Sequence, residues 1–111
     1  MDTCTASHIV FERKLVAPEN LGLDERDAFR RDALLLLEGM AAGRGMLVVD
    51  LAATRSVDSA GLGTLLLIQR RASERRIPVV LRHPISEVRF LLLVTRLDGL
   101  FALDPAEGPA G

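Results

Sequence analysis

Aromatic residues and cysteine are scarce in this sequence. Its 111 residues include four Phe, no Trp and no Tyr. A chain of this length is expected to form one domain with a single core. Because aromatic residues are scarce, Leu, Val, Ile and Ala must fill that core. The one cysteine, Cys4, has no partner for an internal disulfide, which fits a reducing compartment.

Long apolar runs and a large net charge are also missing. The longest apolar segments, such as 90–94, fall far short of the roughly 18 residues that a membrane span needs. The first residues, MDTCTASHIV, lack the basic start and the apolar stretch of a secretory signal. A net charge of −1 argues against a general nucleic-acid binder. We therefore expect a soluble, cytoplasmic protein with no membrane insertion and no direct nucleic-acid binding.

The densest group of like charges is basic and lies in QRRASERRIP (69–78). This segment falls at the end of a predicted helix, where cations complement the helix dipole and face water. A docking patch for an acidic partner is the alternative. The four cations are Arg70, Arg71, Arg75 and Arg76.

Segments with strand and helix patterns alternate along the chain. The patterns predict strands over 8–16, 46–51, 77–83 and 100–104, and helices from near Asp24, over 59–75 and over 83–99. Strand 46–51, MLVVDL, is nearly all apolar and should be buried on both faces. Such alternation predicts an α/β fold: a mainly parallel sheet of about four to five strands with helices packed on it. We expect one domain over 8–104, a flexible N-terminus over 1–7 and a disordered tail over 105–111.

Side-chain periodicity refines these elements. Ile9, Phe11 and Leu15 should share the buried face of the first strand. Asp24 is a good cap for the first helix, whose apolar stripe is Phe29, Ala33, Leu36, Leu37 and Met40. Pro84 suits the start of the last helix and Gly99 its C-terminal cap. The Gly-rich segment 39–45 follows a helix and precedes a strand, the reverse of a phosphate-binding loop.

Residues 48–66, VVDLAATRSVDSAGLGTLL, place an Asp-Ser pair where a strand leads into a helix. Polar groups beyond the carboxyl ends of strands are typical of binding sites in α/β sheets. Asp58 or Ser59 could cap the helix, which is worth about 1 kcal/mol. A hydrolase nucleophile would need G-x-S-x-G, but Val57 replaces the first glycine and the chain has only two histidines. The remaining interpretation is that Ser59 accepts a phosphoryl group from a kinase.

A helix N-terminus tolerates a phosphate, because its free N–H groups and dipole favour negative charge. Phosphorylation of Ser59 would add a charge of about −1.5 to −2 beside Asp58. Unmatched charge at an interface costs about 2–5 kcal/mol, which is roughly 30-fold to several thousand-fold in affinity. Such a modification would switch binding and leave folding intact.

This stretch resembles the STAS domain family, particularly the bacterial anti-sigma factor antagonists. Their pattern is a strand ending in Asp-Leu, then an apolar residue and Asp-Ser-(Ser/Thr/Ala)-Gly-Leu-Gly before an apolar helix. The corresponding residues are Asp50-Leu51 and Val57-Asp58-Ser59-Ala60-Gly61-Leu62-Gly63. The segment VVLRHPISEVRFLLLVTRLDGLF resembles the last strand and helix of these proteins. The resemblance covers about residues 24–103.

The resemblance implies that Ser59 is the phosphate acceptor. It implies an anti-sigma factor serine kinase as partner, bound only by the unphosphorylated protein, and a serine phosphatase that resets the switch. The implied partner-binding residues are Asp24, Asp58, Ser59, Ala60, Gly61, Leu62 and Gly63. No catalysis, cofactor or metal is expected. Glycine early in a helix costs up to about 1 kcal/mol, so Gly61 and Gly63 indicate either close approach of a partner or tight helix packing.

The sequence departs from the family pattern at three places. Ala60 stands where many antagonists carry a second hydroxyl, and Ser56 replaces an aromatic residue. One clear strand precedes the first helix where the family commonly has two, and Gly22-Leu23-Asp24 stands for the usual Gly-x-Leu-Asp. Ala60 is also typical of STAS subunits of ABC-type lipid-trafficking transporters, which is the main alternative. An unmodified STAS component of a larger signalling scaffold is the third.

The last predicted helix carries more apolar residues than one buried face needs. Most of them should belong to the core, but Phe90, Leu93 and Leu97 are candidates for an exposed protein contact. The sequence leaves the oligomeric state open between a monomer and a weak dimer.

Overall fold

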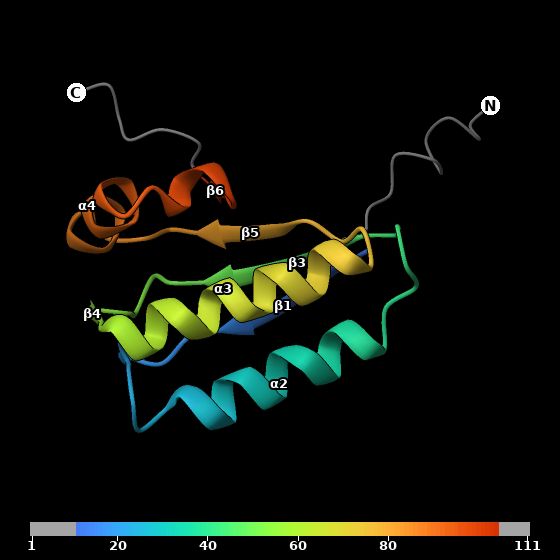
Figure 1. The fold of residues 1–111 in the computed structure, drawn as a ribbon, viewed down its shortest axis with the longest axis horizontal. Coiled ribbons are helices and arrows are strands. Elements are labelled where there is room, and N and C mark those ends of the chain that lie inside the picture. Colours follow the sequence, from blue (N-terminus) through green and yellow to red (C-terminus); the bar gives the residue numbers. More distant parts are fainter. Residues whose placement is uncertain (1–10, 105–111) are drawn as a thin grey trace.

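The computed structural model describes residues 11–104, which form a four-stranded parallel sheet with two long helices across one face (Figure 1). The sheet order is β1-β3-β5-β6. The strands are β1 (Glu12–Val16), β3 (Met46–Asp50), β5 (Val79–Arg82) and β6 (Ala102–Asp104), and β2 (Asn20–Leu21) and β4 (Ser56–Val57) form a separate pair. The helices are α2 (Arg26–Glu38), α3 (Ser59–Glu74), α4 (Ser86–Val94) and the short 3₁₀ helix η1 (Leu97–Gly99). The predicted α/β fold is confirmed.

The core lies between the sheet and helices α2 and α3. Alternate strand residues point toward the helices and meet one apolar stripe from each. On β3, Leu47 and Val49 belong to this core, and Val48, on the opposite face, is also fully buried. The prediction of a central strand buried on both faces is therefore confirmed. The helix residues that close the core are Phe29, Ala33 and Leu37 from α2, Leu65, Ile68 and Ala72 from α3, and Val88 and Leu92 from α4. Leu97 of η1 also belongs to this core, so the expectation that it would be exposed was wrong.

Charged side chains link the strands on the opposite face of the sheet. Arg82 donates from Nη1 to Glu12 Oε2 at 2.8 Å and from Nε to Asp104 Oδ2 at 2.9 Å. These two hydrogen bonds raise the pKa of the Arg82 guanidinium. Arg82 thereby connects the central strand β5 to both edge strands, β1 and β6. A third ion pair on this face joins Lys14 Nζ to Asp50 Oδ2 at 3.5 Å.

The N-terminal predictions need three corrections. The first described strand begins at Glu12, and residues 8–10 lie outside the described chain. Phe11 is 57% exposed, so it does not share a buried face with the half-buried Leu15. Helix α2 begins two residues after Asp24. Its cap position is occupied by Glu25 without a side-chain hydrogen bond, because the carbonyl of Gly22 accepts the N–H groups of residues 25 and 26 instead.

The predicted helix over 83–99 was also wrong in its extent. Helix α4 ends at Val94, where the Thr95 hydroxyl donates to the carbonyl of Leu91. Arg96 then adopts a left-handed φ of 62° and breaks the helix before η1. Gly99 therefore lies in a separate short helix and caps no long one. The strand predicted over 77–83 is shortened to β5 because Pro78 lacks an N–H and His83 has a φ of 59°.

Two further predictions concern the chain ends and membranes. The expected flexible N-terminus (1–7) and disordered tail (105–111) lie outside the described residues. Between residues 11 and 104, no helix combines the length and apolarity that a bilayer crossing requires.

Candidate functional site

Two very short strands bring distant loops together at the carboxyl edge of the sheet. In the parallel β2–β4 pair, Asn20 lies opposite Ser56 and Leu21 opposite Val57. The Ser56 hydroxyl donates to Asn20 Oδ1 at 2.7 Å. This pairing places the segment before α2 against the Asp-Ser segment, 36 residues later in the chain. Sequence patterns did not predict it, because two-residue strands are too short to show periodicity.

Asp58 connects these two segments through its carboxylate. It occupies the N-cap position of α3 in an extended conformation, and its Oδ1 accepts the N–H of Gly61 at 2.9 Å. Its Oδ2 accepts the N–H of Leu23, in the loop before α2, at 3.3 Å. Its own N–H donates to the carbonyl of Leu21 at 3.2 Å. Asp58 is therefore both the cap of α3 and the residue that holds the neighbouring loop in place.

Two glycines make this close contact possible. A Cβ atom at Gly61 would lie 2.1 Å from the carbonyl oxygen of Leu21, and one at Gly22 would lie 2.6 Å from Asp58 Oδ2. Both distances are well inside van der Waals contact. At Gly61 the obstacle is backbone, so only glycine fits there. At Gly22 the obstacle is the Asp58 carboxylate, which would have to move and give up its contact with Leu23. In the sequence, Gly61 and Gly63 alike indicated either the close approach of a partner or tight helix packing. The structure separates them: Gly61 packs against β2, whereas a Cβ at Gly63 would meet nothing within 4 Å.

Ser59 is the first residue of α3, and its side chain is exposed. Since Asp58 provides the cap, the Ser59 hydroxyl is not needed for it. This hydroxyl makes no hydrogen bond with any residue of 11–104. It therefore has no histidine base beside it in that range, where His83 is the only histidine. The first N–H groups of a helix have no partners within the helix. An exposed hydroxyl thus lies beside backbone donors that favour an anion.

The other residues implied by the resemblance surround this junction with different exposures. Asp24 is exposed and lines an open hollow of about 410 Å³ that Asp58 also lines. Ala60 and Leu62 are half-buried, Gly61 is buried and Gly63 is exposed. The structure therefore places residues of the loop before α2 and of the first turns of α3 side by side. Leu62 contributes partly to the core, because it packs against the buried cluster.

Sequence reasoning missed the buried Thr54. This threonine is fully buried, and its hydroxyl donates to the carbonyl of Pro18 at 2.8 Å. The bond joins the β1–β2 loop to the β3–β4 loop just before the paired strands. A threonine within a polar loop gives no sequence signal of burial, since only the pairing of two distant loops encloses it.

Asp50 shapes the start of the same loop. Its Oδ1 accepts the N–H of Ala52 at 2.9 Å, a local turn that Asp favours. This backbone hydrogen bond, together with Lys14, lowers the pKa of the Asp50 carboxyl. The charged form of Asp50 therefore stabilises the turn that leads from β3 to the Asp-Ser segment.

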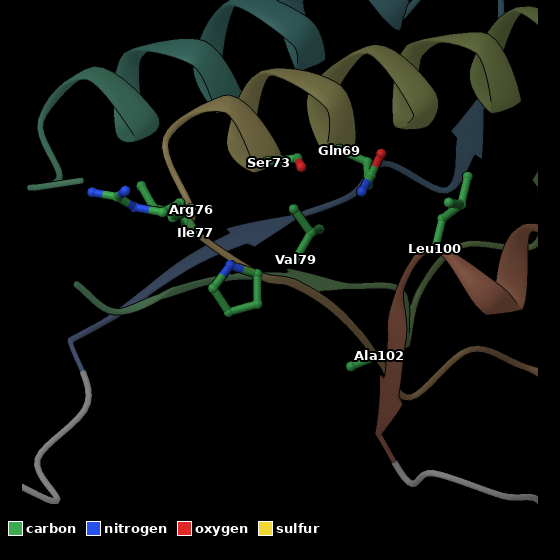
Figure 2. Close-up of a pocket in the computed structure, with 8 residues that line it drawn as sticks. Gln69, Ser73, Arg76, Ile77, Val79, Leu100 and Ala102 are labelled. Carbon is green, nitrogen blue, oxygen red and sulfur yellow. The ribbon is translucent and has the colours of Figure 1, made fainter. Parts of the chain in front are cut away.

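A second hollow, of about 310 Å³, lies at the opposite edge of the sheet (Figure 2). Gln69 and Ser73 extend from the last half of α3 toward it, and Leu100 lies across from them. Arg76 lines the same hollow, while the side chain of Arg75 donates to the carbonyl of Met40. The latter contact supports the interpretation that part of the basic segment stabilises helix ends. This hollow lies far from Ser59, at the other end of α3.

Comparison with known proteins identifies the family. A family model described as "Mlab, STAS domain" matches residues 12–103. The chain belongs to the STAS domain family. This STAS domain also resembles the crystal structure of a "putative anti-sigma factor antagonist" from Thermotoga maritima, with a TM-score of 0.70 and 19% sequence identity. The similarity covers 86% of this chain and 81% of the other and establishes a shared fold. No curated protein matches the sequence significantly.

Proposed function

We propose that this STAS domain is an anti-sigma factor antagonist controlled by phosphorylation of Ser59. The unphosphorylated form binds an anti-sigma factor serine kinase, releases the sigma factor and so regulates transcription in the cytoplasm. The observation that carries this proposal is the exposed Ser59 hydroxyl, which is free of the capping role that Asp58 performs. The domain itself performs no catalysis and requires no cofactor.

The position of Ser59 supports a switch in binding that leaves the fold intact. A phosphate on Ser59 would face solvent at the start of α3, where the helix dipole favours it. The same group would add negative charge to a surface that already carries Asp58 and Asp24. A partner that matches the unmodified surface would then face unpaired charge, which costs about 2–5 kcal/mol at an interface. A phosphatase that removes the phosphate restores binding.

Phosphorylation itself is the first test. The protein is incubated with radiolabelled ATP and each purified kinase-type anti-sigma factor of the source genome. One kinase should label the wild type, and Ser59→Ala should abolish the label. Ser73→Ala is the matched control, because Ser73 is an exposed serine at the other end of the same helix. Labelling that survives in Ser59→Ala, or no labelling by any of these kinases, contradicts the proposal.

The second test separates binding from stability. Ser59→Asp should weaken binding to the kinase that labels the wild type by roughly 30-fold or more. It should leave the melting temperature nearly unchanged, since Asp is accepted in the first turn of a helix. Calorimetric titration measures the first quantity and circular dichroism the second. A large loss of stability with unchanged affinity would mean that the position is structural.

A STAS subunit of an ABC-type lipid-trafficking transporter is the alternative favoured by Ala60. The similarity to the Thermotoga maritima structure supports the fold and leaves this choice open, at 19% identity. The alternative predicts that the tagged protein co-purifies with a permease and an ATPase and that no kinase labels Ser59. An unmodified scaffold component would show neither property.

A further inference from the structure

Among residues 11–104, the largest group of exposed apolar side chains lies on α4. Phe90, Leu93 and Val94 are respectively 65%, 50% and 56% exposed, so the expectation of exposure is confirmed for Phe90 and Leu93. The described residues around this face do not indicate what covers it. Another exposed leucine, Leu23, differs from this group because it lies beside the candidate phosphorylation site.

Leu23 is 61% exposed in the short loop before α2. It lines the open hollow of about 410 Å³ that Asp24 and Asp58 also line. Leu21, two residues earlier, is 1% exposed and belongs to the core, so this loop directs one leucine inward and leaves the other outside. Single exposed leucines are common on protein surfaces. Exposure alone therefore assigns no role to Leu23, and its fixed backbone and its place next to Ser59 are the informative features.

Hydrogen bonds fix the backbone on both sides of Leu23. Asp58 Oδ2 accepts the N–H of Leu23 at 3.3 Å. The carbonyl of Gly22 accepts the N–H groups of residues 25 and 26 at 3.2 Å and 2.9 Å. Gly22 itself is buried and packs closely against the Asp58 carboxylate. The Leu23 side chain is therefore held toward solvent by an ordered backbone, and a partner that buries it loses little conformational entropy in this loop.

A kinase that phosphorylates Ser59 also covers Leu23. Its catalytic groups have to reach the Ser59 hydroxyl, and Asp58, the residue next to Ser59, contacts the N–H of Leu23. A specific interface buries about 800 Å² on each partner, which corresponds to a patch about 30 Å across. Leu23 therefore falls inside the area that the kinase occupies.

We propose that Leu23 is an apolar anchor for kinase docking and that a phosphate on Ser59 acts by preventing burial of this leucine. This role of Leu23 rests on the proposed function and adds the chemistry of the partner, which presents an apolar surface to Leu23. Burial of the leucine removes water from the surface around it. A phosphate beside such an apolar contact would have to lose its hydration, which disrupts the contact. Phosphorylation thereby switches binding without any movement of the backbone.

Substitutions of Leu23 test the anchor in calorimetric titrations with the kinase that labels wild-type Ser59, with ADP in place of ATP. Leu23→Ser should raise the dissociation constant about tenfold or more, because it removes most of the apolar area that the kinase buries at this position. Leu23→Met should bind within about threefold of the wild type, since the two side chains have similar volume and polarity. Leu100→Ser is the matched control, because Leu100 is 48% exposed beside the hollow at the opposite edge of the sheet. It should leave binding unchanged, and circular dichroism should show that all three variants remain folded.

A double-mutant cycle tests the link between Leu23 and the phosphate. Ser59→Asp is introduced into the wild type and into the Leu23→Ser variant. If the charge acts by preventing burial of Leu23, it should weaken the Leu23→Ser variant by a factor at least about twofold smaller than it weakens the wild type. Equal factors in the two backgrounds would overturn this link.

The possible outcomes distinguish the anchor from the proposed function. If the kinase labels Ser59 but binds Leu23→Ser as tightly as the wild type, Leu23 has no docking role, while the proposed function stands. If Leu100→Ser weakens binding as much as Leu23→Ser does, the loss is not specific to the docking surface and the anchor is wrong. If no kinase labels the wild type, both the anchor and the proposed function fail.

Discussion

Gly61 and Gly63, two residues apart in α3, should respond in opposite ways to the same substitution. Alanine is about 1 kcal/mol better than glycine within a helix. At Gly63 nothing opposes that gain, because an added Cβ meets no atom within 4 Å. At Gly61 the Cβ would lie 2.1 Å from the carbonyl oxygen of Leu21 and 3.0 Å from Val57 Cγ1. The first contact is with backbone, so a side-chain rotation cannot relieve it.

The magnitudes follow from these distances. Gly63→Ala should stabilise the domain by about 1 kcal/mol. Overpacking costs about 1–3 kcal/mol, and a clash with backbone belongs at the upper end of that range. After subtracting the helix gain, Gly61→Ala should destabilise the domain by about 2 kcal/mol. The two variants should therefore differ by about 3 kcal/mol, or about 12 °C in melting temperature at about 4 °C per kcal/mol.

Urea unfolding followed by far-ultraviolet circular dichroism measures both changes, since the chain has no Trp or Tyr for fluorescence. Unchanged slopes with shifted midpoints would attribute the changes to the folded state. If Gly61→Ala matches or exceeds the wild type in stability, α3 packs less closely against β2 than these distances indicate.

Gly63→Ala has a second readout, because it adds a methyl group to the proposed docking surface. It should weaken binding to the kinase although it stabilises the domain.

Substitutions at three further positions test the polar contacts of the site. Asp58→Ala should lower the free energy of unfolding by about 1–2 kcal/mol, because α3 loses its cap. Asp58→Asn should lower it by only a fraction of that, since Asn is also a good cap. Equal losses in the two variants would refute the capping role. Thr54→Val should lower the free energy of unfolding in urea by about 1–3 kcal/mol, because it removes the hydroxyl that donates to the carbonyl of Pro18, and a neutral result would contradict that contact. Asp50 has a lowered pKa in the folded state, so its charge stabilises the fold above the ordinary value of 3.8, and this contribution is lost as the pH falls through the lowered pKa. Asp50→Asn should therefore lose less stability than the wild type between about pH 5 and pH 2, and parallel pH profiles would argue against the assigned cause.

Local sequence patterns predicted the regular elements well where the pattern was long. Strand 46–51 and the helix from Ser59 were predicted to within a residue of their observed ends. Predictions at the ends of other elements were less accurate, because backbone contacts decided them. The carbonyl of Gly22, and not the side chain of Asp24, receives the first N–H groups of α2. The left-handed Arg96 ends the last helix early, and no propensity of arginine indicates that conformation.

In the candidate site, too, the sequence indicated some features and only tertiary contacts decided the others. The Asp-Ser sequence at a strand-to-helix junction already indicated Ser59, and the structure places that residue at the first position of α3. That Asp58 rather than Ser59 caps the helix was left open by the sequence, since both residue types are good caps. The hydrogen-bond geometry resolved it. The two roles of glycine at 61 and 63 were likewise inseparable from sequence, because they depend on how far the nearest atom of another segment lies.

The sequence by itself determined the order of strands and helices, the apolar stripes that form the core and the position of Ser59 at a strand-to-helix junction, because periodicity and capping are local properties of the chain. Only the tertiary structure decided which loops meet at Asp58, why residue 61 must be glycine and which face of α4 is left uncovered. Those features arise from contacts between segments that are far apart in sequence. Their strength depends on distances that no local pattern encodes.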